Sequence, residues 1–194
     1  VCTDLICQRV GCALMSDDRP EEERELGSRR LVTGVDSNGD SFAEIDAPTR
    51  GFIDYGKAVI SEIWIDAGGN PANQQDLVSE RQVLSPPAGG SVCRIFIMRP
   101  KGSFTVKLAE SDQFSTGQEM ETSEVSGPRW HTTKTIDYAF VLRGTIELLL
   151  DDGSHLLSPG DVVVQRATRH AWRNPGQTDC EIAFVLIDRS VTIG

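Results

Sequence analysis

The feature that most constrains the fold is a series of short β-strand patterns between residues 128 and 188, each ended by a turn signal. Apolar and β-branched runs cover 136–142, 145–150, 155–157, 162–165 and 181–187. Gly, Asp or Pro separates these runs, as in Pro159-Gly160-Asp161. Many short strands at close spacing, with no helical period between them, are typical of an antiparallel sandwich or a closed barrel. We therefore predict an all-β fold.

The preceding part of the chain predicts further strands, joined by longer loops. Residues 31–45 form two apolar runs around Asn38-Gly39, which indicates a hairpin. More strands are predicted at 58–65, 91–98 and 103–108, with a long binding loop or lid at 67–90 that holds one short helix near 77–83.

The length of 194 residues favours one domain with extensions. We divide it into an appendage at 1–28 (poorly structured or a short helix), strands and loops at 29–127 that complete the barrel and supply dimer contacts, and the chemistry-bearing region at 128–190.

The charge balance and the cysteines bear on partners and location. A formal net charge of −10 would repel a nucleic-acid backbone, so no nucleic-acid partner is expected. No apolar run is long enough to cross a bilayer, and no secretory signal is visible, so no membrane partner is expected either. Cys2, Cys7 and Cys12 match no zinc or redox pattern. Unpaired thiols and a cytoplasmic location are expected.

Several polar residues occupy alternate positions on the predicted strands. Side chains at alternate strand positions share a face, so His131, Thr133 and Asp137 point the same way, as do His170 and Trp172. Burying two imidazoles and a carboxylate is costly unless they are paired, hydrogen-bonded or bound to a cation. The sequence therefore predicts that these groups gather in the interior as the centre of the chemistry.

The spacing of these residues resembles the two motifs of the cupin family. His131, Thr133 and Asp137, followed by Gly144, are similar to the first motif, in which His, His, a carboxylate and Gly recur. Residues 159–161, followed by His170 and Asn174, are similar to the second motif. The resemblance implies a jelly-roll β-barrel.

The resemblance also implies a divalent transition metal, such as Fe, Mn, Ni or Zn, held in the barrel. Carried over residue by residue, His131, Asp137 and His170 match ligand positions, whereas Thr133 replaces the second His and Asp137 replaces the more usual Glu. Two His and one carboxylate suffice for a transition ion with open positions. The alternative is a barrel that has lost its ion and keeps these groups for hydrogen bonding or acid–base work.

The function implied by the resemblance is that of a small-molecule enzyme, a lyase or isomerase of secondary metabolism or carboxylate breakdown. Decarboxylation, dehydration and isomerisation all fit. The alternatives are an Fe(II)-dependent dioxygenase, a metal-free isomerase with His170 or Asp137 as general base, and a metabolite-binding module.

Four more residues complete the predicted site. Arg166 either clamps a substrate carboxylate or faces water at the rim. Thr133 orients substrate, and Tyr138 and Trp172 form its apolar wall. A homodimer is expected, with the hairpin at 31–45 as the edge that a second subunit covers.

Overall fold

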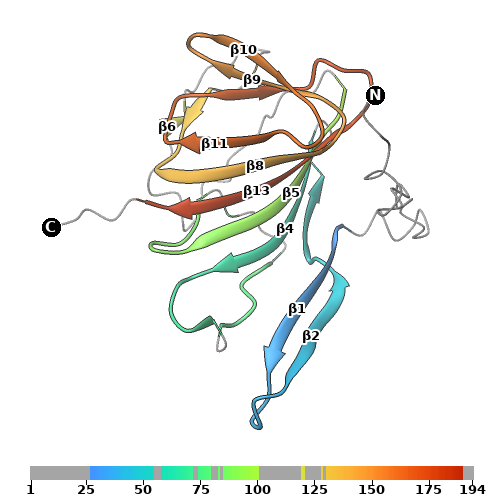
Figure 1. Ribbon diagram of the computed structural model, residues 1–194, viewed down its shortest axis with the longest axis vertical. Helices are drawn as coiled ribbons and strands as arrows, with labels where there is room; N and C mark the ends of the chain where they lie inside the picture. The colour runs from blue at the N-terminus through green and yellow to red at the C-terminus, as the bar shows by residue number, and fades with distance from the viewer. Residues whose placement is uncertain are drawn as a thin grey trace, which may run out of the picture.

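Six antiparallel strands form the main sheet of the computed structural model (Figure 1). The structure describes residues 27–54, 58–71, 74–79, 83, 85–100, 119–120, 128 and 130–189, with the backbone alone at 119–120. In spatial order, the sheet consists of β11 (Val162–Arg166), β8 (Thr135–Arg143), β13 (Cys180–Asp188), β5 (Ser91–Met98), β4 (Ala58–Asp66) and β3 (Gly51–Asp54).

A smaller sheet packs against the inner face of the main sheet. It consists of β10 (Gly153–Leu157), β9 (Ile146–Leu150) and β12 (Ala171–Arg173), in that order. The two sheets share one core, to which the smaller sheet contributes Ile146, Leu148 and Trp172, and the main sheet Ile60, Phe96, Met98, Val141 and Ile182. Two facing antiparallel sheets around one core confirm the predicted all-β class and fit the predicted jelly-roll barrel.

The alternation along β8 decides which side chains enter the barrel. Thr135, Asp137, Ala139 and Val141 are buried, whereas Tyr138 and its even-numbered neighbours face outward. The pairing of β8 with β11 and β13 carries this inner face across the sheet. The inward positions of β8 follow this period of two, whereas register shifts interrupt the pairing of β13 with β8 and of β4 with β5.

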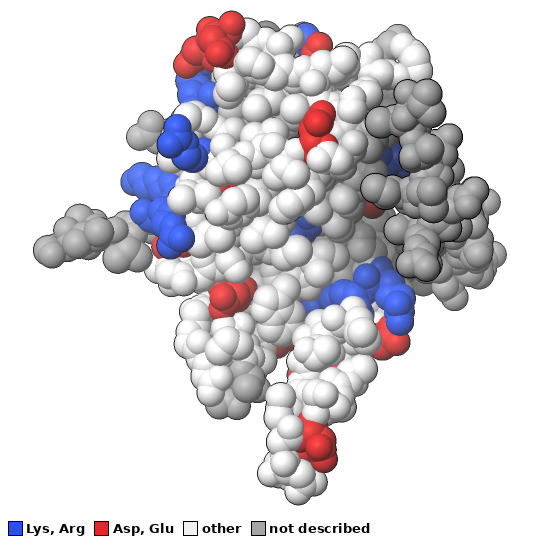
Figure 2. Space-filling view, viewed as in Figure 1, with Lys and Arg blue, Asp and Glu red and all other residues white. Residues whose placement is uncertain are grey.

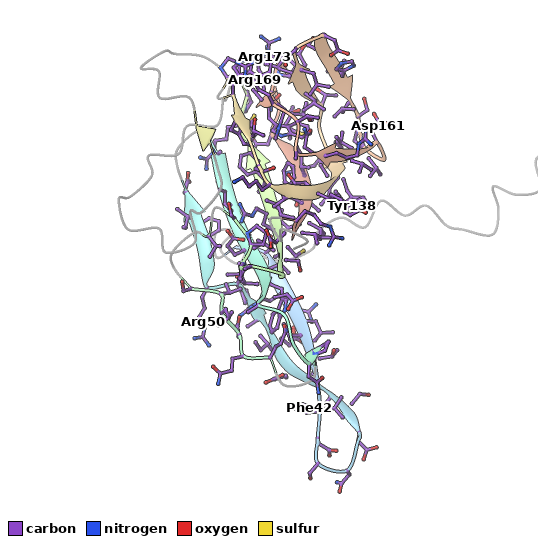
Figure 3. The ribbon with its side chains drawn as sticks, turned by 90° about the vertical axis from the view of Figure 1, so that its left-hand side faces the viewer. Phe42, Arg50, Tyr138, Asp161, Arg169 and Arg173 are labelled. Carbon is purple, nitrogen blue, oxygen red and sulfur yellow. The ribbon has the colours of Figure 1, made fainter. Side chains whose placement is uncertain are left out.

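The predicted hairpin forms and extends away from the two sheets (Figure 1). It consists of β1 (Arg29–Val35) and β2 (Ser41–Pro48), which pair antiparallel. Gly39 in the turn has φ +88°, a left-handed conformation that glycine adopts without strain. Phe42, near the far end of the hairpin, is exposed (Figure 3).

A short ladder lies at one end of the barrel. It joins β6 (Glu119–Met120) to β7 (His131–Thr132). His131 also forms an isolated antiparallel bridge with His170, so the start of the second predicted motif lies beside the first.

Most predicted strands are confirmed with their bounds shifted by a residue or two. The predicted ranges leave out β3, β6, β7 and β12, because each is only two to four residues long. The helix predicted near 77–83 is wrong for its described residues, 77–79 and 83, which are not helical. The strand at 103–108 and the appendage at 1–26 lie outside the described residues, and the division into three regions stays a prediction. Within the described part of the chain, no helix is long and apolar enough to cross a membrane.

Candidate functional site

Two histidines far apart in the sequence lie in contact inside one end of the barrel. The backbone amide of each donates to the carbonyl of the other at 3.0 Å, which holds the two residues opposite one another. Their imidazole rings have centroids 4.2 Å apart and are tilted by 51°. His131 is half-buried and His170 is buried. The structure therefore brings together the two histidines that the sequence singled out.

The tautomer and charge of His170 follow from its surroundings. Its Nδ1 lies 2.9 Å from the carbonyl oxygen of Thr168. Because a carbonyl can only accept, Nδ1 carries the hydrogen, and Nε2 is unprotonated in the neutral ring. Burial and, secondly, the charge of His131 lower the pKa of His170 to about 4. At neutral pH His170 is thus an uncharged imidazole with a fixed tautomer.

In the turn before His170, the carbonyl oxygen of Thr168 accepts hydrogen bonds from two side chains, those of His170 and Gln165. Gln165, buried on β11, also donates through Nε2 to the Thr168 oxygen, at 3.1 Å. Ala167 lies in the left-handed region with φ +51°, which is uncommon for a residue other than glycine. Sequence reasoning missed Gln165, although its inward phase opposite Asp137 was a usable signal.

Asp137 lies on the inner face of β8, next to two threonines. Thr133 Oγ1 donates to its Oδ2 at 3.5 Å, and Thr135 Oγ1 donates to Thr133 Oγ1 at 2.8 Å. Its Oδ1 is buried and has no hydrogen-bond partner among the described residues. Burial raises the pKa of Asp137, against the hydrogen bonds of the threonines and the charge of Arg94. The protonated form is therefore more favoured than for an exposed Asp, and it would supply a donor to the interior.

A buried ion pair lies on the same inner face. Arg94 on β5 lies 3.2 Å from Oε1 of Glu62 on β4, and both side chains are almost fully buried. Arg94 also donates to the carbonyl of Val83, which ties residue 83 of the long loop to the sheet. Burial raises the pKa of Glu62, opposed chiefly by the charge of Arg94. Sequence reasoning missed this pair, although a charged residue in the inward phase of an apolar strand is a recognisable signal.

Aromatic side chains separate the histidine pair from the apolar core. His170 and Trp172 meet edge to face, with ring centroids 6.2 Å apart. Trp172 in turn contacts Phe184 at 5.6 Å, and Phe184 contacts Phe96 at 6.1 Å. Trp172 thus lies beside His170 as part of the core, and its role as a wall of the substrate site stays a prediction.

Tyr138 and Arg166 are placed elsewhere than the predicted site. Tyr138 is an even-numbered residue of β8 and points away from the barrel (Figure 3). Arg166 pairs with Ile136 of β8, which puts it on the same outer face, where it is exposed. The period of two excludes both side chains from the inner face, so neither lies with the histidines.

The histidine pair supplies two of the side-chain ligands that a transition metal in a protein site uses. A neutral His170 with Nδ1–H engaged is the form that binds a metal through Nε2. However, within the described ranges no three His, Cys, Asp or Glu side chains lie together as a metal-binding group. The two imidazoles alone are fewer than the three protein ligands of a typical catalytic site. The described residues thus do not fit a three-ligand metal site.

Fold and site together define a jelly-roll barrel with an inward-facing histidine pair, the architecture of a cupin. Residues 118–187 match the family model described as Cupin domain. The match includes His131, Asp137 and His170. This part of the chain is therefore similar to a cupin domain.

Several fungal proteins share part of this sequence. The phomopsin biosynthesis cluster protein C' of Diaporthe leptostromiformis is 38% identical over 112 residues, which cover 55% of this chain and 47% of that protein. The oryzines biosynthesis cluster protein J of Aspergillus oryzae is 48% identical over 68 residues, covering 34% and 38%. The cupin-domain-containing oxidoreductase srdD of Neurospora crassa is 42% identical over 62 residues, covering 30% and 32%. The chain thus spans about half, or less, of the length of these relatives.

Proposed function

We propose that this chain is an enzyme that moves a proton at a carbon next to a carbonyl group in a small organic metabolite, as a lyase or isomerase of secondary metabolism. The observation that carries this proposal is the contact between His131 and His170, with the tautomer of His170 fixed by Thr168. The similarity to proteins of the phomopsin and oryzines biosynthesis clusters supports the metabolic setting.

His170 stays uncharged at neutral pH, because its burial and, secondly, the charge of His131 lower its pKa to about 4. His131 is only half-buried, so its ring is the one of the pair that solvent reaches more readily. In the proposed step, His131 takes the proton from carbon, and the electron pair moves to the carbonyl oxygen.

The proton held by His131 can take part in three reactions. In an isomerisation, the His131 imidazolium gives it to a different carbon of the same molecule. In a dehydration, it goes to the departing hydroxyl group, which leaves as water. In a decarboxylation, a protonated His131 supplies the proton to the carbanion left by carbon dioxide.

Asp137 can supply a hydrogen-bond donor, and Arg94 a positive charge, for the negative charge that develops on the carbonyl oxygen of the substrate. The raised pKa of Asp137 favours its O–H form, and its buried Oδ1, which has no hydrogen-bond partner among the described residues, leaves that group available as a donor. The charge of Arg94 acts on Asp137 from the neighbouring part of the inner face. We propose that Asp137 donates to the carbonyl oxygen of the substrate as it gains charge, and that Arg94 stabilises the resulting anion.

The experiment starts from the metabolite that accumulates when this chain is deleted in its source organism. The purified protein is incubated with that metabolite in deuterated water, without oxygen and with chelator present. The proposal predicts a product of altered double-bond position, lost water or lost carbon dioxide. An isomerised or decarboxylated product should carry deuterium at one carbon in NMR spectra, because a proton is added to carbon in these two reactions. His131→Gln is expected to lower kcat by about 100-fold or more, since general acid–base groups contribute roughly 10²–10⁴.

The matched control is His155→Gln, the same substitution at an exposed histidine on β10 that lies 3.1 Å from Asp152. It should retain full turnover. Turnover that requires dioxygen, or a decarboxylated product without solvent deuterium, would contradict the proton-transfer proposal.

A second candidate function is a metal-dependent oxidoreductase, including the Fe(II) dioxygenase considered from the sequence. The name of the Neurospora crassa relative favours it. It requires a third metal ligand besides the two imidazoles. Elemental analysis of protein purified without added metal or chelator tests it. A stoichiometric transition metal that is lost in both His131→Ala and His170→Ala, together with oxygen-dependent turnover, would establish this alternative.

A further inference from the structure

The connection between β11 and His170 lies outside the strands of both sheets. It covers residues 167–169, so its backbone is not held by a strand ladder. Backbone polar groups in such a segment find their partners among side chains or water. The Thr168 carbonyl oxygen accepts from Nδ1 of His170 at 2.9 Å and from Nε2 of Gln165 at 3.1 Å. Two side chains, and not a sheet, therefore determine how this carbonyl is oriented.

Gln165 joins this connection to a strand of the main sheet. Its backbone pairs with Asp137 of β8, and its side chain is buried. Its Nε2 donates to Oγ1 of Thr168 as well as to the carbonyl oxygen, and an amide nitrogen has two hydrogens for these two bonds. Rotation of the Thr168 peptide would leave the buried amide without its carbonyl partner, which is costly. Gln165 thus opposes that rotation.

The charged residues of the same segment lie at the surface. Arg166 is exposed, and Arg169 lies 2.8 Å from Asp151 and stacks over the ring of Trp130, 4.2 Å from its centroid. In Figure 2, basic side chains gather toward the left edge and the lower right of the viewed face, and its middle is largely uncharged. The groups that donate to the Thr168 carbonyl from inside are a neutral amide and a neutral imidazole. The amide can therefore orient the carbonyl without adding charge to the site.

We propose that Gln165 is a positioning residue for His170: its amide holds the Thr168 carbonyl in the orientation that selects the Nδ1–H tautomer of the ring. The hydrogen bond of one imidazole nitrogen determines which nitrogen carries the hydrogen, so Nε2 remains the acceptor. Without Gln165 the carbonyl can turn toward water, and the hydrogen can then occupy either nitrogen. This inference rests on the proposed function for its catalytic meaning, because a proton-transfer site requires correctly placed donors and acceptors next to the reacting base, His131.

The first test uses the wild-type chain labelled with ¹⁵N at histidine and glutamine, at pH 7. The ¹⁵N chemical shifts of the His170 ring should show a hydrogen on Nδ1 and none on Nε2. That hydrogen and one amide hydrogen of Gln165 are donated to the same oxygen, so a nuclear Overhauser effect should connect them. A hydrogen on Nε2, or no Overhauser effect between the two groups, would overturn the proposal without depending on the folding of any variant.

The second test removes the donor with Gln165→Met, a side chain of similar length that packs adaptably in a core. The ratio of the Nδ1–H to the Nε2–H tautomer of His170 should fall by about tenfold, the effect of losing one hydrogen bond. The matched control is Gln74→Met, the same substitution at a glutamine that donates to the Gly68 carbonyl at 3.2 Å in another loop. It should leave the His170 ratio unchanged. An unchanged ratio in Gln165→Met, shown by circular dichroism to be folded, would overturn the proposal.

Turnover of the accumulating metabolite separates this inference from the proposed function. Gln165→Met is expected to lower kcat by about tenfold with little change in KM, because the amide acts on the ring and not on the substrate. A variant whose tautomer ratio changes while kcat stays at the wild-type value would confirm the effect of Gln165 on His170 and contradict the proton-transfer proposal. A variant that loses turnover with an unchanged tautomer ratio would contradict the positioning role alone.

Discussion

At the scale of single residues, the chemistry depends on how burial changes the charge of His170. Its pKa is lowered from 6.5 to about 4, so the unfolded chain binds a proton between these values and the folded chain does not. This difference in proton binding favours the folded state fully above pH 6.5, and its contribution to stability is lost as the pH falls toward 4. The shift corresponds to about 3 kcal/mol at most.

This predicts that urea unfolding at pH 4.5 and at pH 7 will show a pH-dependent loss of stability that His170→Gln reduces. The same measurement on His155→Gln should reproduce the wild-type dependence. If removing His170 left the loss between pH 6.5 and 4 unchanged, its burial as a neutral ring would be disproved.

The Arg94–Glu62 pair gives a second prediction at this scale. Both charges are buried and only partly hydrogen-bonded, with both Glu62 oxygens lacking a hydrogen-bond partner in the described part of the chain. Arg94→Met leaves Glu62 buried without its cation and should cost about 3–5 kcal/mol in the free energy of unfolding.

The double variant Glu62→Met with Arg94→Met removes both charges and should cost much less than the single variant. Denaturant titrations of the three proteins measure the difference. A double variant as unstable as Arg94→Met would mean that lost packing, and not an unpaired charge, sets the cost.

At the scale of elements, the sequence predicted what short-range patterns encode. The Asn-Gly turn located the hairpin, and the regular alternation of β5 and β8 located two central strands. The convergence of His131 with His170 was also predictable, because both lie in motif-like spacings on inward phases. The outward position of Tyr138 followed from the same alternation and was missed because Tyr138 was judged by residue type, whereas the exposed position of Arg166 was one of the two alternatives considered.

Other features were not predictable from local sequence. The strands β3 and β12 are too short to show a period and form because longer neighbours pair with them. The Arg94–Glu62 pair depends on the register of β4 against β5, which no short window contains. The position of the Thr168 carbonyl, which accepts from both His170 and Gln165, depends on the left-handed conformation of Ala167. That conformation is unusual for an alanine.

The turn between β8 and β9 supplies a prediction at this scale. Gly144 has φ +73°, and a Cβ there would lie 2.3 Å from the carbonyl oxygen of Asp179. Gly144→Ala should therefore cost more than about 2 kcal/mol, because strain in the left-handed region adds to a backbone clash. Gly160→Ala is the control, since Gly160 has φ +94° with open space around it. Thermal unfolding of both variants should show the larger loss for Gly144.

At the scale of the whole molecule, packing is unequal between the barrel and the hairpin. The shared core involves strands of both sheets, whereas β2 is exposed along nearly its whole length. Arg30 anchors the base of the hairpin by donating to Asp76 at 2.9 Å and to the Ile63 carbonyl. We expect amide hydrogen exchange to be fastest near the hairpin turn and slowest in β13 and β8. Slow exchange at Asn38 and Gly39 would indicate that another surface covers the hairpin.

The most direct test of the central claim is an NMR measurement on protein with isotope-labelled histidine. The chain has three histidines, and His155→Gln identifies one of them. The account predicts strong nuclear Overhauser effects between the rings of His131 and His170, and a His170 ring that stays neutral until the pH is near 4. Rings without a mutual Overhauser effect, or a His170 that titrates near pH 6.5, would contradict the claim that the two histidines form one buried pair.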